Sequence, residues 1–421
     1  MRQNKVLVDA ITKATKGNGR LHLMGLLSDG GVHTYDTACF ELLAMAKTAG
    51  VKQVFIHVVT DGRDVPPQSA AKYVHTLQNK ISALGIGTIA TLQGRWWVMD
   101  RDHRWERIEA AYKLLVLGEG LQQANNAEAA ITAAYRRGET DEFIQPTIIA
   151  AEGVMGNDDT VVNFNFRIDR EIEITQALIE PNFHHFERRH FPKLHYVGMS
   201  QYYSEMKAPA ALQRVELAAK KILGEVLSDR GYTQLRLTET EKWVYVTKIF
   251  NVMREDPFPG EERVLIPSDK IATYDLKPAM QAANIAKEAV KHLNSNAFDV
   301  YIMNFPNADM LGHTGNKAAT IEGVQAIDNA LKLIYDELKQ HNGVMMITAD
   351  HGDAEVMWDK EWNCPHTFHT DSFVPFILID EEHKTVQLRD DGTLKDCAPT
   401  ILDILEESKP AEMTGTSLIV H

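Results

Sequence analysis

The sequence contains few cysteines, no long apolar run and too little basic charge to balance its acidic charge. Cysteine occurs only at positions 39, 364 and 397. An odd number of widely spaced cysteines argues against a disulfide framework and predicts reduced thiols in a cytoplasmic setting. No run of about 18 apolar residues occurs, which excludes a membrane-spanning helix. The net charge of -14 argues against a broad surface for nucleic acid or an anionic membrane.

What is present is the composition of an ordinary globular protein. Hydrophobic residues make up 44% of the chain and charged residues 24%, as in typical soluble domains. A length of 421 residues suits two or three domains. Near the start, apolar residues recur at helical spacing without the features of a secretion signal, which predicts an amphipathic first helix.

Apolar runs rich in β-branched residues alternate with longer helical patterns. Strands are expected at 21–27, 51–60, 87–94 and 160–166, with helices at 37–50 and 69–85 between them. This rhythm predicts a parallel α/β sheet whose ligands lie outside the carboxyl ends of the strands. It pauses near "SQYYSEMKAPAALQ" and resumes with expected strands at 242–250, 262–267, 298–305, 343–350 and 374–380. The predicted domains are therefore 1–210 and 211–421.

Three segments of the second half pair a carboxylate or imidazole with an imidazole near the end of an expected strand. The pairs are Asp309 with His313, Asp350 with His351, and His366 with His369. Mixed oxygen and imidazole ligands suit Mn²⁺ or Zn²⁺ better than Mg²⁺. Any one pair is more often a helix cap or a core histidine, but three pairs in one series favour a metal site. For His366 a structural or substrate-facing role is an equal alternative.

The first half places arginines at the same kind of position. The arginines, together with one aspartate and one histidine at similar positions, form a set of candidate anion-binding residues. The set is His33, Arg63, Asp64, Arg95, Arg101, Arg167 and Arg170. Guanidinium groups bind phosphate and carboxylate through two hydrogen bonds, so such a set suits a small, doubly anionic molecule. The alternative is a set of solvated surface arginines. An anion site in one domain and a metal site in the other fits phosphoryl transfer.

Several motifs resemble those of a known family. "SDGGVH", "TDGRDVPP", "NFRIDR", "TETEK" and "ITADHGD" occur in collinear order and resemble the 2,3-bisphosphoglycerate-independent phosphoglycerate mutases of the alkaline-phosphatase superfamily. The resemblance implies an α/β protein of two domains, an alkaline-phosphatase-like α/β sandwich, incomplete at its N-terminus, and an α/β transferase domain. It also implies interconversion of 3-phosphoglycerate and 2-phosphoglycerate in glycolysis through a metal-activated phosphoserine.

The resemblance assigns roles by position. Asp309, His313 and His369 would bind one Mn²⁺, and Asp350 and His351 a second. The seven residues of the arginine-rich set, from His33 to Arg170, would bind substrate. Asp64 would act as a base on the glycerate hydroxyl, and Lys242 of "TETEK" would contact the phosphoryl group.

The sequence also departs from the family pattern. Residues 1–20 contain no counterpart of the family's early metal-binding aspartate or of its serine nucleophile. We therefore expect one bound ion, an exposed sheet edge and weak activity or none. Asp353 stands where the family usually has asparagine. Mg²⁺, Co²⁺ and Zn²⁺ remain open as alternatives to Mn²⁺.

Two other functions are left open: a non-catalytic protein that binds phosphoglycerate and metal, and another phosphomutase or phosphatase of the superfamily. We expect a monomer with a small-molecule substrate and no nucleic-acid or membrane partner. A cleft between two domains implies hinge closure, for which residues 205–216 are the candidate segment.

Overall fold

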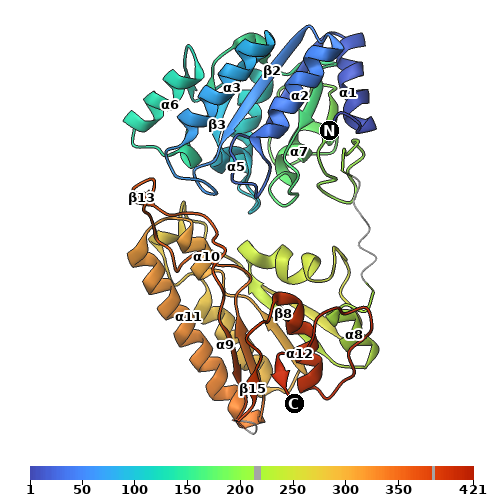
Figure 1. Ribbon diagram of the computed structural model, residues 1–421, viewed down its shortest axis with the longest axis vertical. Helices are drawn as coiled ribbons and strands as arrows, with labels where there is room; N and C mark the ends of the chain where they lie inside the picture. Colours follow the sequence, from blue (N-terminus) through green and yellow to red (C-terminus); the bar gives the residue numbers. More distant parts are fainter. Residues whose placement is uncertain (213–219, 382–384) are drawn as a thin grey trace. The chain divides into compact units, whose positions relative to one another are not determined.

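The computed structural model describes residues 1–212, 220–381 and 385–421 (Figure 1). It divides into two compact units. The first contains Met1–Val215 and Lys360–Phe368, and the second contains Glu216–Asp359 and His369–His421. Of the candidate hinge, residues 213–216 lie outside the described residues. Within the described residues, no helix is long and apolar enough to cross a bilayer.

The first unit is built on a seven-stranded sheet in the order β4-β5-β3-β2-β1-β6-β7. β1 pairs in parallel with β2 on one side and β6 on the other, so that Leu23 lies opposite both Ile56 and Val162. β3 and β7 extend this parallel core, whereas β5 runs antiparallel to β3. The strands are β1 (Arg20–Leu26), β2 (Gln53–Thr60), β3 (Thr88–Gly94), β4 (Gln122–Gln123), β5 (Thr147–Ile148), β6 (Thr160–Asn163) and β7 (His195–Gly198).

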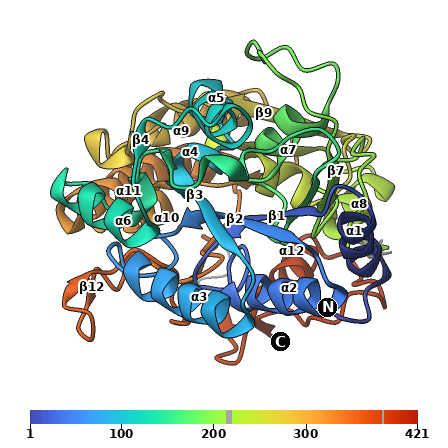
Figure 2. The same ribbon diagram turned by 90° about the horizontal axis from the view of Figure 1, so that it is seen from above.

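Helices cover both faces of this sheet, because successive strand residues point to opposite sides. In β1, Leu23 belongs to a core that includes α1, α2, α3 and α6, whereas Met24 belongs to a core with α5 and α7. Figure 2 shows α2 and α3 on one side of β1 to β3, and α5 and α7 on the other. The helices are α1 (Lys5–Lys16), α2 (Asp36–Ala49), α3 (Ala70–Leu84), α4 (Arg95–Val98), α5 (Trp105–Tyr112), α6 (Ala127–Arg136) and α7 (Ile172–Ile179).

The second unit contains a three-stranded parallel sheet in the order β10-β8-β9 and a separate antiparallel pair, β11 with β14. Leu235 and Leu237 of β8 pack with apolar residues of α9 and α11 to form its main core. The strands are β8 (Gln234–Glu239), β9 (Glu261–Ile266), β10 (Val300–Met303), β11 (Met345–Thr348), β14 (Phe376–Ile379), β15 (Gln387–Leu388) and β16 (Ile419–Val420). The helices are α8 (Leu223–Asp229), α9 (Ala282–Asn294), α10 (Asn307–Gly312), α11 (Lys317–Leu338) and α12 (Cys397–Ile404). The chain also forms the short strands β12 (Trp358–Asp359) and β13 (Cys364–Pro365).

One expected strand of the second unit is wrong. Residues 242–250 form a helical turn that ends at Lys242 and a π-helix, Tyr245–Ile249. The true strand, β8, lies just before them and was not predicted, because it carries Gln234, Arg236 and Thr238 as buried polar residues. A strand that buries such side chains lacks the apolar run by which buried strands are identified. The last expected strand, 374–380, forms as β14 but runs antiparallel to its neighbour.

Candidate functional site

The predicted anion-binding residues follow four adjacent parallel strands of the first unit. His33 follows β1, Arg63 and Asp64 follow β2, Arg95 follows β3, and Arg167 follows β6. Because β3, β2, β1 and β6 are neighbours in the sheet, their carboxyl ends share one edge. We refer to His33, Arg63, Asp64, Arg95, Arg101, Arg167 and Arg170 together as the arginine cradle.

Arg95 lies at the centre of the cradle and is only 3% exposed. Its Nη1 is 2.8 Å from Oδ1 of Asp61 and 2.5 Å from Oδ2 of Asp64. Its Nη2 is 2.9 Å from Nε2 of His33, and because a guanidinium only donates, this imidazole nitrogen is the acceptor. Burial, and then the charge of Arg95, hold the pKa of His33 well below its usual value. His33 is therefore a neutral ring at pH 7.

Arg101, Arg167 and Arg170 gather around Asp169, whereas Arg63 pairs with Glu142. Oδ2 of Asp169 is 2.9 Å from Nη1 of Arg101, and its Oδ1 is 2.8 Å from Nε of Arg167. Burial alone would raise the pKa of Asp169, but Arg167 and Arg101 hold it well below the usual value. Burial, followed by the charges of Arg101, Arg63 and Arg95, lowers the pKa of Arg170 to about 10. The guanidinium groups thus crowd one another, and a small anion placed among them would relieve their repulsion.

The second unit brings three of the predicted metal ligands into contact. Asp309 lies in α10 and His313 follows one helical turn later, with its Nε2 3.1 Å from Oδ1 of Asp309. Nε2 of His369 is also 3.1 Å from that oxygen. The other oxygen of Asp309 is 2.8 Å from Nζ of Lys242. Burial would raise the pKa of Asp309, but His313 and Lys242 hold it well below its usual value.

The other two predicted ligands lie at the margin of this group. The ring of His351 stacks on that of His369 with 3.7 Å between their centroids, and its Nε2 is 3.7 Å from Asp309 Oδ1. The carboxylate of Asp350 is 3.5 Å from His351, and its side chain is 61% exposed.

Sequence reasoning did not predict Asp353 as part of this site. One potential ligand atom from each of Asp309, His313, Asp353 and His369 lies within 4.8 Å of the others, and we call these four residues the Asp/His cluster. The available sequence signal for Asp353 was the second aspartate of "ADHGD". Among the described residues, the cluster does not include His366. The carboxylate and imidazole groups gathered here are the kinds of donor that fit Mn²⁺ or Zn²⁺.

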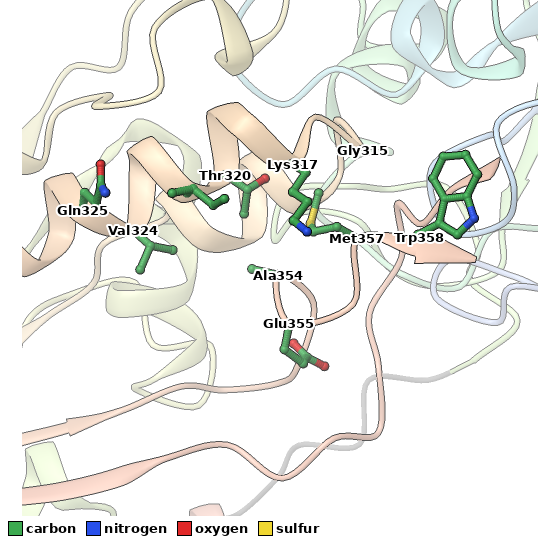
Figure 3. Close-up of a pocket in the computed structure, with 10 residues that line it drawn as sticks. Gly315, Lys317, Thr320, Val324, Gln325, Ala354, Glu355, Met357 and Trp358 are labelled. Carbon is green, nitrogen blue, oxygen red and sulfur yellow. The ribbon is translucent and has the colours of Figure 1, made fainter. Parts of the chain in front are cut away.

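A separate pocket with a volume of about 690 Å³ lies beside the segment that follows Asp353. Figure 3 shows Lys317 and Thr320 of α11 on one side and Ala354, Met357 and Trp358 on the other. None of the cluster residues lines this pocket. It is therefore distinct from the Asp/His cluster.

The fold and the two groups of side chains define an α/β protein with an arginine-rich cradle on one unit and a carboxylate–imidazole cluster on the other. Residues 1–204 match the family model described as the BPG-independent PGAM N-terminus. Residues 226–401 match the model of type I phosphodiesterase / nucleotide pyrophosphatase.

Relatives match the chain over almost its full length. The 2,3-bisphosphoglycerate-independent phosphoglycerate mutase of Moorella thermoacetica is 45% identical over 99% of this chain and 81% of its own. That of Acetivibrio thermocellus is 46% identical over 99% of this chain and 82% of its own. A crystal structure of Leishmania mexicana phosphoglycerate mutase at low cobalt concentration superimposes with a TM-score of 0.89, at 31% identity, over 98% of this chain and 80% of that one. The chain belongs to the 2,3-bisphosphoglycerate-independent phosphoglycerate mutase family, whose members are isomerases.

Proposed function

We propose that the chain interconverts 3-phosphoglycerate and 2-phosphoglycerate in glycolysis, with the arginine cradle as its substrate site. The observation that carries the proposal is the crowding of buried and half-buried guanidinium groups at the carboxyl edge of the first sheet, in a member of this family. Phosphoglycerate carries a phosphate and a carboxylate, and both groups are bound well by paired guanidinium donors. The proposed substrate residues are His33, Arg63, Asp64, Arg95, Arg101, Arg167 and Arg170.

Asp64 is the proposed base for the glycerate hydroxyl. Its carboxylate is buried and contacts Arg95, and it is 3.9 Å from Nε2 of the neutral His33. A base held in place by a fixed guanidinium can take a proton without first reorganising its surroundings. Asp64→Asn would keep the shape of the side chain and remove this capacity. We expect turnover to fall with little change in ligand affinity, and unchanged turnover would exclude Asp64 as the base.

Asp309, His313 and His369 are the proposed ligands of one Mn²⁺, and Asp350 and His351 of a second. A divalent cation bound there would neutralise negative charge on a phosphoryl group and activate an oxygen nucleophile. Lys242 holds Asp309 ionised in its contact with Oδ2, and we propose that its ammonium group also contacts the phosphoryl group. Mn²⁺ is favoured over Mg²⁺ because of the imidazole content.

The chain is also proposed to be a cytoplasmic monomer. Cys39, Cys364 and Cys397 form no disulfide, and Cys39 is buried in the first core. Free thiols fit a reducing compartment. Sedimentation would test the monomer, and a stable dimer would contradict it.

The test of function is the conversion of 3-phosphoglycerate, followed by ³¹P NMR with the Mn²⁺-loaded chain. Formation of 2-phosphoglycerate that is lost in Asp309→Asn supports the proposal. The weak activity expected from the sequence stays a prediction, which the same measurement tests. Calorimetry with 3-phosphoglycerate separates binding from turnover. Binding without turnover would favour a non-catalytic protein, and absence of both at millimolar ligand would overturn the proposal.

A further inference from the structure

Asp353 stands out because its carboxylate is buried beside a proposed metal ligand that the sequence did not connect with it. Asp353 is only 4% exposed. Burying a carboxylate is costly unless charged or hydrogen-bonding groups compensate it. Oδ2 of Asp353 is 3.7 Å from Nδ1 of His313. The imidazole that also contacts Asp309 is therefore one group that compensates this carboxylate.

The two nitrogens of His313 face different carboxylates. Nε2 is 3.1 Å from Oδ1 of Asp309, on the side where His369 also contacts that oxygen. Nδ1 faces Asp353. An imidazole that binds a metal through one nitrogen commonly presents the N–H of the other to a carboxylate, which fixes its tautomer and ring orientation. Asp353 occupies the position of that carboxylate.

The backbone around Asp353 is arranged to hold this position. Its N–H donates to Oε2 of Glu355 over 2.7 Å, and Glu355 also accepts a hydrogen bond from the hydroxyl of Thr370. The N–H of Thr370 donates to the carbonyl of Gly352 over 2.9 Å. These bonds join the segment that carries Asp353 to the segment that carries His369.

The helix that carries Asp309 also leaves room for Asp353. A Cβ atom at Gly312 would lie 2.1 Å from Oδ1 of Asp353. Only glycine at the end of α10 therefore lets the carboxylate pack against the helix backbone. Two independent features, a glycine in α10 and the pairing of Gly352 with Thr370, bring Asp353 to His313.

We propose that Asp353 is a positioning residue of the metal site, which acts through His313 by keeping the N–H at Nδ1, facing its carboxylate, and leaving Nε2 to the cation. This inference rests on the proposed metal-binding role of Asp309, His313 and His369. It assigns a role to the position at which this chain carries aspartate where asparagine is usual in the resembled motif. The negative charge makes the imidazole a stronger donor to a cation than a neutral amide would.

The experiment measures Mn²⁺ affinity of the full chain by calorimetry, without substrate. Asp353→Ala removes the acceptor, and Asp353→Asn keeps an acceptor oxygen but removes its charge. We expect the dissociation constant to rise about 10-fold to 100-fold in Asp353→Ala, and less in Asp353→Asn. The matched control is Asp328→Asn, which removes an exposed charge from α11 and should leave the affinity unchanged.

The visible spectrum of the Co²⁺-loaded chain separates positioning from direct ligation. If Asp353 acts through His313, the variants at saturating Co²⁺ show the spectrum of the unaltered chain. A changed spectrum would make Asp353 a direct ligand and overturn the positioning role. Equal Mn²⁺ affinity of the unaltered chain, Asp353→Ala and Asp353→Asn would overturn the inference and leave the proposed metal site intact. Failure of the unaltered chain to bind Mn²⁺ would overturn the proposed metal site itself, and this inference with it.

Discussion

At the scale of single residues, Arg170 is a cradle arginine whose positive charge is opposed by its surroundings. Its side chain is half-buried, and burial, followed by the charges of Arg101, Arg63 and Arg95, lowers its pKa to about 10. Its Nη1 donates a hydrogen bond, 3.0 Å long, to the carbonyl of Met99. Arg170→Met should therefore weaken 3-phosphoglycerate binding by about 10-fold to 100-fold, the value of one or two charge-assisted hydrogen bonds. Titration calorimetry measures this loss.

Because Arg170→Met also removes a charge that repels its neighbours, it should cost little stability. We expect the free energy of unfolding to fall by less than about 1 kcal/mol. Arg136→Met, at an exposed position of α6, is the matched control and should leave binding unchanged. Unchanged affinity in Arg170→Met would place the substrate elsewhere.

A second residue-scale prediction concerns two histidines buried in the first sheet. Nδ1 of His22 is 2.9 Å from Nε2 of His57, Nε2 of His22 is 2.9 Å from Asp159, and Nδ1 of His57 is 3.0 Å from Oγ1 of Thr91. Burial lowers the pKa of His22 and, together with the charge of His22, lowers the pKa of His57 well below its usual value.

The sign of the pH effect follows from these lowered values. The unfolded chain takes up a proton on each histidine below about pH 6.5, and the folded chain resists it. Stability should therefore be full above pH 6.5 and fall on acidification, by at most about 1.4 kcal/mol per pH unit for each histidine. In His57→Gln, urea unfolding should show a shallower decline from pH 6.5 to 5. The exposed control His75→Gln should keep the original slope, and equal slopes in all chains would contradict the prediction.

Single residues also show where sequence reasoning reaches its limit. The cradle arginines could be predicted because each stands a few positions after an apolar run, and that relation is local. Their partners could not, since Asp61 lies 34 positions from Arg95, and Asp169 lies 68 positions from Arg101. Asp353 was missed for the same reason: its contact with His313 depends on how two distant segments pack.

At the scale of elements, α10 carries the proposed metal ligand Asp309, is followed directly by His313, and depends on a glycine in another helix for its position. A Cβ atom at Gly323 of α11 would lie 2.1 Å from Cδ1 of Leu311 and 3.1 Å from the carbonyl oxygen of Pro278. Leu311 is fully buried, between Asp309 and His313 in sequence. Gly323 therefore sets how closely the two helices approach.

Gly323→Ala should push α10 away from α11. Overpacking of this kind typically costs about 1–3 kcal/mol, and Mn²⁺ affinity should fall because Asp309 and His313 move with the helix. Denaturant unfolding and calorimetry measure the two effects. Glu322→Ala changes an exposed neighbour on the same helix and is the control. Loss of stability with full Mn²⁺ affinity would show that the ligands do not depend on this packing.

Elements were predicted well where one face is apolar and poorly where polar groups are buried. β1, β2 and β3 lie within two residues of the expected strands, because their apolar runs are nearly continuous. β8 hides Arg236, which is fully buried, hydrogen-bonded to Gln234 and placed over the ring of Phe250. No local pattern reveals a charge that is stabilised by partners from other elements.

At the scale of the whole molecule, the arginine cradle and the Asp/His cluster belong to different units. The cradle lies entirely in the first unit and the Asp/His cluster entirely in the second, and each unit has its own hydrophobic core. We therefore expect two calorimetric unfolding transitions. A ligand at 100 times its dissociation constant stabilises the unit that binds it by about 2.7 kcal/mol, which raises the midpoint by roughly 5–10 °C for a unit of this size.

Mn²⁺ should raise the transition of the second unit, and 3-phosphoglycerate mainly that of the first unit, which contains every proposed substrate residue except Lys242. Asp309→Asn should abolish the first shift and keep the second, whereas Arg170→Met should do the reverse. These paired variants show which transition belongs to which unit, because each variant removes a binding side chain from one unit and leaves the other unit unchanged. A single transition shifted by both ligands would show that the two units unfold together and that binding in one stabilises the whole chain. Two transitions that both respond to one ligand would show that its binding site draws on both units.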